Sequence, residues 1–218
     1  MPTAIRAVIF DFGGVLGLPQ DTARVATMAS LCRLSIERFR SAYGRDRSEL
    51  DRGTLSAEEY WSRILESAGV EANPGLIAQI EREDSLGWTG INQGVVDWGA
   101  ELRAAGYLTA ILSNMPTTKL SFMRATGSFD WIDEFRPAIF SCEYLLVKPE
   151  PEIYRLCLNR LAVDPDTCIF LDDVLQNVEA ARALGIHALH FRSPAADAAE
   201  LELRWGLPVS SLRNGSHA

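Results

Sequence analysis

The sequence predicts an α/β fold: a doubly wound parallel sheet with an inserted α-helical cap domain. Short apolar runs rich in β-branched and aromatic residues alternate with longer stretches at helical spacing, which is typical of βαβ units around a parallel sheet. One long interval near the start of the chain has helical patterns and no strand pattern. The 218 residues, 47% hydrophobic and 23% charged, suffice to bury one good core and a smaller second one.

Five apolar runs are the expected strands. They read AVIFDF from Ala7, YLTAILS from Tyr107, PAIFS from Pro137, CIFLD from Cys168 and ALHF from Ala188. Apolar runs of this length, bounded by polar or turn-forming residues, favour buried strands of a parallel sheet.

The segments between the later strands carry helix-end signals. Asn92 is placed to cap a segment with apolar residues at helical spacing, and Pro151 stands at the start of the helical segment IYRLCLNRLAV. A further helix is expected over 177–184, where Gly185 supplies the stop.

The interval 18–86 breaks the alternation of strands and helices. Its patterns TARVATMASLCRL, SIERFRSAYG, SAEEYWSRILESAG and NPGLIAQIEREDSL are helical, and Ser56 and Asn73 are suitable N-caps for the last two. We therefore expect residues 1–17 and 87–218 to form the core domain and residues 18–86 to form a helical cap domain. The ending SSLRNGSHA is polar and small enough to be a frayed tail.

Charge and composition limit the partners. The formal net charge is -8 and the 21 basic residues are scattered, which disfavours nucleic acid and anionic membranes as partners. No apolar run approaches bilayer length, and the start MPTAIRAVIF lacks a signal-peptide pattern. The four cysteines have no metal-ligand spacing and are expected to be reduced. We expect a cytoplasmic monomer or homodimer that acts on a small molecule.

Polar side chains follow four of the expected strands where each strand ends. They are Asp11 after the first strand, Ser113 and Asn114 after the second, Lys148 after the third, and Asp172 with Asp173 after the fourth. In a doubly wound sheet, ligands bind beyond the carboxyl ends of the strands. Carboxylates bind Mg²⁺, whereas hydroxyl, amide and ammonium groups bind phosphate oxygens. The set therefore predicts a site for a divalent cation and a phosphoryl group.

Each of these residues has a plainer interpretation when it is taken alone. A single strand-end aspartate such as Asp11 suits a turn, and the Asp172 and Asp173 pair suits a helix cap. Lys148 suits a solvated surface, and Ser113 with Asn114 suits the start of a turn. The four positions together, in this order and on this topology, favour a functional site.

The same residues resemble the motifs of the haloacid dehalogenase-like hydrolases. FDFGGVL is similar to the first motif of that family, LSN to the second, the lysine of VKPEPEIY to the third and FLDDVLQN to the fourth. The stretch EAARALGI that follows is also similar, and the helices between the first and second motifs resemble the small cap of the family. The resemblance covers nearly the whole chain and implies a Rossmann-like core.

The resemblance implies a phosphatase-type hydrolase in which the Asp11 carboxylate takes the phosphoryl group as an aspartyl-phosphate, which water then hydrolyses. Asp11 and Lys148 are the implied catalytic residues, with Lys148 neutralising the transferring oxygens. The implied phosphate-binding residues are Phe12, Gly13, Gly14, Ser113, Asn114 and Lys148. The implied ligands of the cofactor Mg²⁺ are Asp11, Gly13, Asp172 and Asp173.

Gly13 departs from the usual family pattern, in which a second aspartate at this position protonates the leaving alcohol and later activates water. General acid-base assistance typically supplies about a hundredfold to ten-thousandfold in rate, so its absence predicts a slow phosphatase or one restricted to better leaving groups. Family members with glycine here resemble sugar-phosphate phosphatases, including ones that act on glucose 1-phosphate. Asp21, Asp46 and Glu49 of the cap are candidates to replace the missing acid.

Three functions compete on the sequence. The leading one is a Mg²⁺-dependent phosphatase for a small phosphorylated metabolite such as a sugar phosphate. A haloacid dehalogenase is the second; the Asp172 and Asp173 pair disfavours it, because that chemistry uses no metal. A catalytically silent binding or regulatory protein of the same fold is the third.

The cap is expected to supply the specificity contacts. The candidates are Tyr43, Arg45, Arg47, Arg52, Tyr60 and Trp61. For Tyr60 and Trp61 the favoured interpretation is that they form the core of the cap, and arginines on such helices are more often solvated than ligand-binding.

Overall fold

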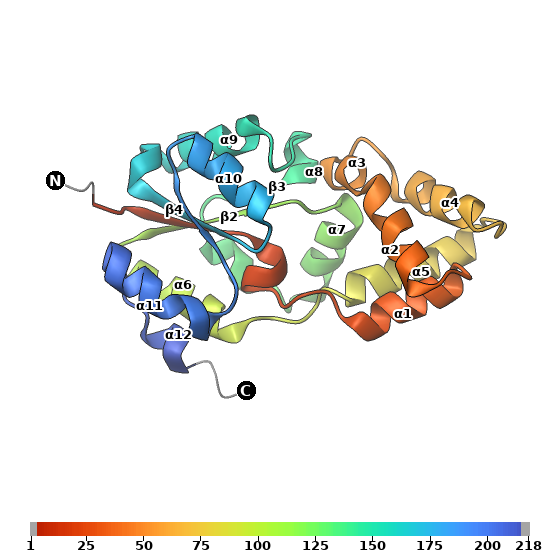
Figure 1. Ribbon diagram of the computed structural model, residues 1–218, viewed down its shortest axis with the longest axis horizontal. Helices are drawn as coiled ribbons and strands as arrows, with labels where there is room; N and C mark the ends of the chain where they lie inside the picture. Colours follow the sequence, from red (N-terminus) through yellow and green to blue (C-terminus); the bar gives the residue numbers. More distant parts are fainter. Residues whose placement is uncertain (1–3, 215–218) are drawn as a thin grey trace.

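The computed structural model of the chain describes residues 4–214. Five strands form one sheet in which all neighbours are parallel, in the order β3-β2-β1-β4-β5. The strands are β1 (Ala7–Phe10), β2 (Leu108–Ser113), β3 (Ala138–Phe140), β4 (Cys168–Asp172) and β5 (His187–His190). Helices cover both faces of the sheet (Figure 1). The prediction of a doubly wound α/β protein is confirmed.

Helices of the sheet-containing part connect these strands or follow the last of them. They are α6 (Gln93–Ala104), α7 (Thr117–Thr126), η2 (Asp130–Glu134), α8 (Ser141–Tyr144), α9 (Pro151–Leu161), η3 (Pro165–Thr167), α10 (Leu175–Ala183), α11 (Pro194–Trp205) and α12 (Ser210–Asn214). Asn92 is the residue before α6 and Pro151 is the first residue of α9, as predicted. Helix α10 begins two residues before the predicted start.

Two apolar layers hold the helices on the sheet, because successive side chains of a strand point to opposite faces. Val8 and Phe10 of β1 belong to the layer that contains Trp98 of α6. Ala7 and Ile9 belong to the layer that packs against α9 and α10. The strands therefore carry apolar side chains toward both layers, and the polar residues predicted to form the site lie where the strands end.

Five helices between β1 and β2 pack around a third apolar cluster of their own. They are α1 (Thr22–Leu31), α2 (Ile36–Arg45), α3 (Arg47–Arg52), α4 (Ala57–Ser67) and α5 (Pro74–Leu86). Ser56 begins α4 with a capping box and Asn73 caps α5, as their sequence positions predict. In Figure 1 these helices form a body beside the sheet, the cap. The exact division at residues 17/18 and 86/87 stays a prediction.

The two connections between the cap and the core run side by side. Gly17 and Ile91 form an antiparallel bridge, and the Leu18 N–H donates to the Gly90 carbonyl at 2.9 Å. The Asp21 N–H donates to the Gly87 carbonyl, also at 2.9 Å. The cap is thus attached through a short two-stranded ribbon.

The predicted polar tail is partly wrong. Residues 210–214 form α12, in which Leu212 is buried, and the Glu101 carboxylate of α6 accepts from the N–H groups of Ser210 and Ser211. The rest of the predicted tail, 215–218, lies outside the described residues, as do residues 1–3. Over residues 4–214, no helix has the length and apolar character needed to cross a membrane. The four cysteines are free.

Candidate active site

Asp11 follows β1 and begins a tight turn at the carboxyl edge of the sheet. The Phe12 N–H donates to the Asp11 carboxylate at 2.7 Å, and the chain then closes a five-residue helical turn, η1 (Phe12–Leu16). Gly14 has φ +72°, a backbone conformation that residues with a side chain rarely adopt. A Cβ at this position would also lie 2.4 Å from the Asp173 carboxylate. Only glycine therefore allows the backbone after Asp11 to pass so close to Asp173.

Lys148 joins two of the acidic strand ends. Its Nζ lies 2.8 Å from Asp11 Oδ1 and 2.6 Å from Asp172 Oδ2, and its side chain is 1% exposed. Burial alone would lower the pKa of Lys148, but the carboxylates of Asp11 and Asp172 outweigh it and raise that pKa. The lysine is held as a buried cation beside the proposed nucleophile.

Asp172 is fixed by donors from its own loop and helix. The Val174 N–H donates to Oδ1 at 2.8 Å, and the Asn177 side-chain amide donates to both carboxylate oxygens at 3.1 Å. Asn177 was not predicted as a site residue. The only available signal was its place within FLDDVLQN, five residues after Asp172 and in the first turn of α10.

Asn114 positions the backbone that carries the lysine. Its side-chain amide donates to the Lys148 carbonyl at 2.9 Å, and its side-chain oxygen accepts from the Lys148 N–H at 2.8 Å. The side chain is therefore engaged, and a phosphate contact by Asn114 would use its backbone N–H instead. Ser113 lies buried at the end of β2, beside β1 and β3.

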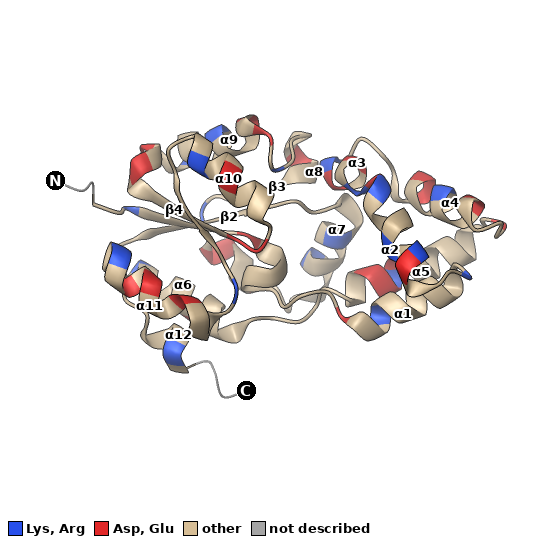
Figure 2. Cartoon of the chain, viewed as in Figure 1, with Lys and Arg blue, Asp and Glu red and all other residues tan. Residues whose placement is uncertain are grey.

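The three aspartates fit a divalent cation. Carboxylate oxygens of Asp11, Asp172 and Asp173 lie within 4.8 Å of one another. Burial raises the pKa of Asp11 to about 7, with Lys148 lowering it and Asp172 raising it. Burial also raises the pKa of Asp173, and Asp172 adds to the effect. Three carboxylates this close together form the hard oxygen donor set that Mg²⁺ prefers. Figure 2 shows acidic residues at the loop after β4.

Gly13 lies against an aromatic ring. A Cβ at this position would meet Trp88 Cζ3 at 3.1 Å, while the backbone there is at φ −67°, which any residue can adopt. The ring of Trp88, from the connection that leaves the cap, therefore occupies the place where a side chain at position 13 would begin. Trp88 was not singled out in the sequence.

A polar cluster of the cap, here called the cap cluster, contains Gln20, Tyr43, Arg47, Asp51 and Asp84. Arg47 pairs with Asp51 at 2.9 Å and with Asp84 at 3.2 Å, and its side chain is 17% exposed. Asp84 also accepts from the Tyr43 hydroxyl at 2.6 Å and from the Gln20 amide at 3.0 Å. Tyr43 and Arg47 were predicted as specificity residues; the acids that hold them were not.

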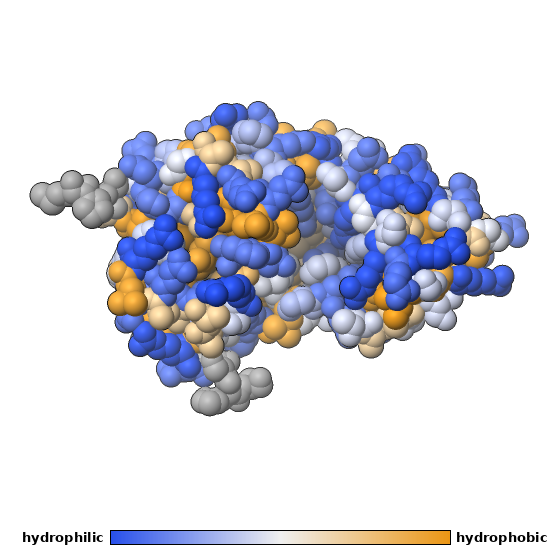
Figure 3. Space-filling view, in the orientation of Figure 1, coloured by the Kyte–Doolittle hydropathy of each residue, from blue (hydrophilic) through white to orange (hydrophobic). Residues whose placement is uncertain are grey.

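Lys119 was also missed. It is buried on α7, with its Nζ 4.3 Å from the centre of the Trp88 ring and 5.1 Å from that of Phe12. Burial and the nearby Arg47 together lower its pKa to about 8, against the opposing effect of the acids Asp84, Asp51 and Asp11. Figure 2 shows basic residues on α7, and Figure 3 shows the surface hollowed between cap and core.

The other candidate cap residues lie in three kinds of surroundings. Tyr60 and Trp61 are buried in the apolar cluster of the cap, which agrees with the favoured prediction that they form its core. Arg45 is exposed. Arg52 pairs with Glu150 of the core.

None of the three acids proposed to replace the one missing at position 13 is brought to the site by a described contact. Asp21 is exposed and caps α1 through the Ala23 N–H at 2.8 Å, and Asp46 pairs with Arg63 at 3.2 Å. Glu49 is exposed and lies 3.9 Å from the same arginine.

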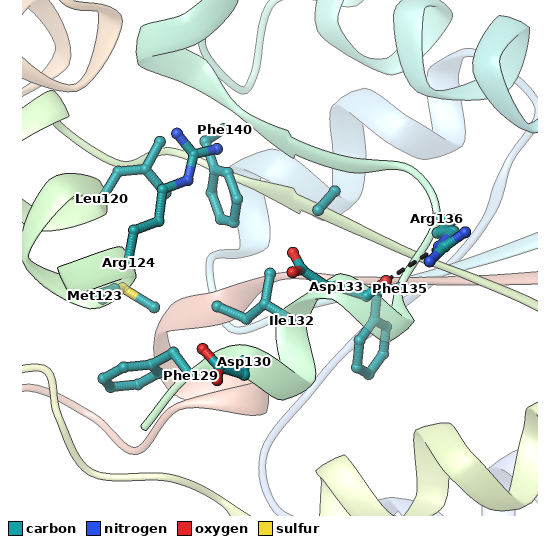
Figure 4. Close-up of a pocket in the computed structure, with 11 residues that line it drawn as sticks. Leu120, Met123, Arg124, Phe129, Asp130, Ile132, Asp133, Phe135, Arg136 and Phe140 are labelled. Atoms are coloured by element: carbon teal, nitrogen blue, oxygen red, sulfur yellow. Dashed lines mark hydrogen bonds between the residues drawn. The ribbon is translucent and has the colours of Figure 1, made fainter. Parts of the chain in front are cut away.

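A cavity of about 520 Å³ lies away from these residues, between α7, η2 and β3 (Figure 4). Its lining includes Met123, Phe129 and Ile132, with Arg124 and Asp133 at the polar side. None of the strand-end carboxylates lines it, so the cavity is separate from the candidate active site.

The sequence is similar to several known proteins over most of its length. It is 28% identical to acyl-CoA dehydrogenase family member 10 of Mus musculus over 94% of this chain, but the chain spans only 19% of that protein. It is 26% identical to sesquiterpene phosphatase astK of Aspergillus oryzae over 92% of this chain and 97% of that protein. Identity to hexitol phosphatase B of Escherichia coli is 27%, over 89% of this chain and 87% of that protein.

The fold is similar to that of a HAD family enzyme, bt-2542, from Bacteroides thetaiotaomicron, with a TM-score of 0.72 and 24% identity over 87% of this chain and 95% of that chain. The same enzyme in complex with magnesium and inorganic phosphate gives a TM-score of 0.70. The model of the haloacid dehalogenase-like hydrolase family matches residues 5–185. The chain therefore belongs to the haloacid dehalogenase-like hydrolases.

Proposed function

We propose that the protein is a Mg²⁺-dependent phosphoric monoester hydrolase that forms an aspartyl-phosphate on Asp11. The observation that carries this proposal is the buried ammonium of Lys148 between Asp11 and Asp172, with Asp173 at the same edge of the sheet. A lone catalytic carboxylate would be repelled by a phosphate dianion. Here it lies next to a fixed cation and to further donors suited to a metal.

The residues of the chain divide the reaction between them. The free oxygen of Asp11 attacks phosphorus, Lys148 hydrogen-bonds and neutralises the transferring oxygens, and backbone N–H groups near Gly14 approach the phosphate without steric hindrance. Mg²⁺, when bound by Asp11, Asp172 and Asp173, with the Gly13 backbone as a further proposed ligand, supplies charge neutralisation for the attack. Asn114 and Asn177 keep the lysine and Asp172 in position.

The chemistry of the cap supports the proposed substrate class. The cap cluster and Lys119 present charged and hydroxyl groups near the site rather than an apolar wall. Such a surface suits a hydroxyl-rich leaving group, because burying polar groups without partners is costly. We therefore propose a small phosphorylated metabolite such as a sugar phosphate, which agrees with the name of the hexitol phosphatase relative.

The test uses p-nitrophenyl phosphate, because its phenol leaves without needing a proton. The wild-type protein should hydrolyse it with Mg²⁺ and not in EDTA. Asp11→Asn should lose about a thousandfold or more of the rate, since removing a nucleophile usually costs several orders of magnitude. Asp130→Asn, an exposed acid in η2, is the matched control and should be unaffected.

Two outcomes contradict the proposal. Full activity in EDTA, together with turnover of a 2-haloacid, would favour the dehalogenase alternative. Binding of Mg²⁺ and phosphate without turnover of any phosphate ester would favour the silent binding protein.

A further inference from the structure

We propose that Lys119 donates the proton to the leaving-group oxygen, and so performs the task that Gly13 cannot. This inference rests on the proposed phosphatase function and names a residue that the family motifs of this sequence do not contain. With this proton donor, the protein would hydrolyse ordinary alkyl phosphate esters, such as those of sugars and polyols, as well as esters with good leaving groups.

Lys119 and Gly13 lie against the same aromatic ring, that of Trp88. Trp88 contacts the place of a Cβ on Gly13 at 3.1 Å, and the Lys119 ammonium lies 4.3 Å from the centre of the same ring. The ammonium also lies over Phe12, the residue between Asp11 and Gly13. The cation is therefore held by two aromatic rings that border the nucleophile turn, on the side of the site that faces the cap.

Lys119 has no carboxylate partner in the described part of the chain. Among residues 4–214, no acid lies within ion-pair distance of Lys119, although the residue is only 5% exposed. Buried cations are normally paired, so an unpaired one in a site is available to a ligand. Arg47 takes both nearby acids, because it pairs with Asp51 and with Asp84.

The charges around Lys119 support a proton donor. Arg47 and Asp51 of α3, Asp84 of α5 and Asp11 after β1 all act on it, and burial with Arg47 brings its pKa down to about 8. An acid of that strength is largely protonated at neutral pH and transfers its proton readily to an alkoxide.

No other acid is as well placed. The three candidates from the sequence, Asp21, Asp46 and Glu49, serve as a helix cap, as a partner of Arg63 or at the surface. Asp51 and Asp84 are bound to Arg47, and Asp84 also accepts from the Tyr43 hydroxyl. Lys119 combines a titratable donor that has no ion-pair partner among residues 4–214 with contact to the ring of Phe12 in the nucleophile turn.

The proposed step is balanced in atoms and charge. A bond forms between an Asp11 oxygen and phosphorus, the bond from phosphorus to the leaving oxygen breaks, and the proton passes from Lys119 Nζ to that oxygen. The alcohol leaves neutral, and the amine of Lys119 accepts a proton from the water that hydrolyses the aspartyl-phosphate. The enzyme returns to its starting state.

The experiment compares phosphate esters whose leaving groups carry no charge: p-nitrophenyl, phenyl and ethyl phosphate, in order of rising leaving-group basicity. Lys119→Met should lower kcat for ethyl phosphate by about a hundredfold or more and for p-nitrophenyl phosphate by less than about threefold. Lys119→Arg should behave like Lys119→Met, because a guanidinium keeps its charge but does not release its proton. Arg124→Met, on the exposed face of the same helix, is the control.

The pH profile of the wild-type protein tests the proposal without any variant. Hydrolysis of ethyl phosphate should fall as the pH rises through about 8, where the donor is lost, and hydrolysis of p-nitrophenyl phosphate should show no such limb. An equal loss on all three esters in Lys119→Met, or full rescue by Lys119→Arg, would overturn proton donation. Those results would contradict only the role of Lys119 and would still agree with the proposed phosphatase function. An active Asp11→Asn variant would instead refute the proposed function.

Discussion

Two buried lysines lie in the candidate active site in opposite electrostatic surroundings. Lys148, at the edge of the sheet, contacts Asp11 and Asp172 at 2.8 and 2.6 Å, and these acids raise its pKa. Lys119, beneath the cap, touches two aromatic rings and no acid among the described residues, and its pKa falls to about 8. The same side chain thus serves as a permanent cation in one region and, as we propose, as a proton donor in the other.

The largest expected effect on the rate is at Lys148, the lysine at the edge of the sheet. Lys148→Met should lower kcat by about a thousandfold or more, because the transferring oxygens lose their fixed cation. The loss should be equal for aryl and alkyl phosphates, in contrast to Lys119→Met. Steady-state kinetics on p-nitrophenyl and ethyl phosphate check this, with Arg155→Met of α9 as an exposed control. A loss confined to alkyl phosphates would erase the distinction between the two lysines.

The next largest effect is expected in the cap cluster, whose acids Asp51 and Asp84 pair with Arg47 and not with Lys119. Arg47→Met strands Asp51 and Asp84 as buried acids, and loss of one partner of a buried ion pair typically costs about 3–5 kcal/mol. Urea unfolding should report this loss, and Arg63→Met, which removes a half-exposed ion pair with Asp46, should change little. Unchanged stability in Arg47→Met would mean that Lys119 or water replaces the arginine.

The pH dependence of stability separates the two lysines further. The pKa of Lys119 is lower in the folded protein than in the unfolded chain, where it is 10.5, so the unfolded chain binds more protons between these values. Lys119 therefore costs stability in full below pH 8, and the cost disappears as the pH rises toward 10.5. Lys119→Met should be more stable than the wild type at pH 7, by up to about 3 kcal/mol. Thermal unfolding across this pH range should show the two proteins converge; a constant gap would be evidence against the shifted lysine.

The smallest effect is expected at Gly13. Gly13→Asp is compatible with the backbone at φ −67°, but its Cβ would lie 3.1 Å from Trp88 Cζ3, so the ring must shift. With Lys119 already donating the proton, we expect less than about a tenfold change in ethyl phosphate hydrolysis, below the range of a newly installed general acid. A hundredfold gain would show that the site lacked a proton donor.

The sequence predicted the sheet side of the site well. Asp11, Lys148 and Asp172 each follow a strand, and parallel strands bring their carboxyl ends to one edge whatever the details of side-chain packing. Their convergence therefore depended only on recognising the strands in order.

The cap side was not predictable in the same way. Lys119 and Trp88 come together from a core helix and a connection of the cap, and Arg47 meets Asp84 across 37 residues. Such contacts depend on how helices are rotated and docked against one another. Apolar periodicity predicts only which face of a helix is buried. Asp21 illustrates the limit: its sequence position was compatible with a catalytic acid, but it is exposed and caps α1.

Contacts between α3 and the core link the cap to the neighbourhood of Lys148. Arg52 of α3 holds the Glu150 carboxylate, two residues after Lys148, and the Ser141 hydroxyl donates to the carbonyl of Asp51. In the proposed reaction, a leaving group that strengthened these contacts would also stabilise the segment that carries Lys148. By thermodynamic reciprocity, phosphate bound at Lys148 would then strengthen the binding of that leaving group by the same factor. Once the ester bond is broken, neither product retains this mutual advantage, and both are expected to leave more easily than the intact substrate.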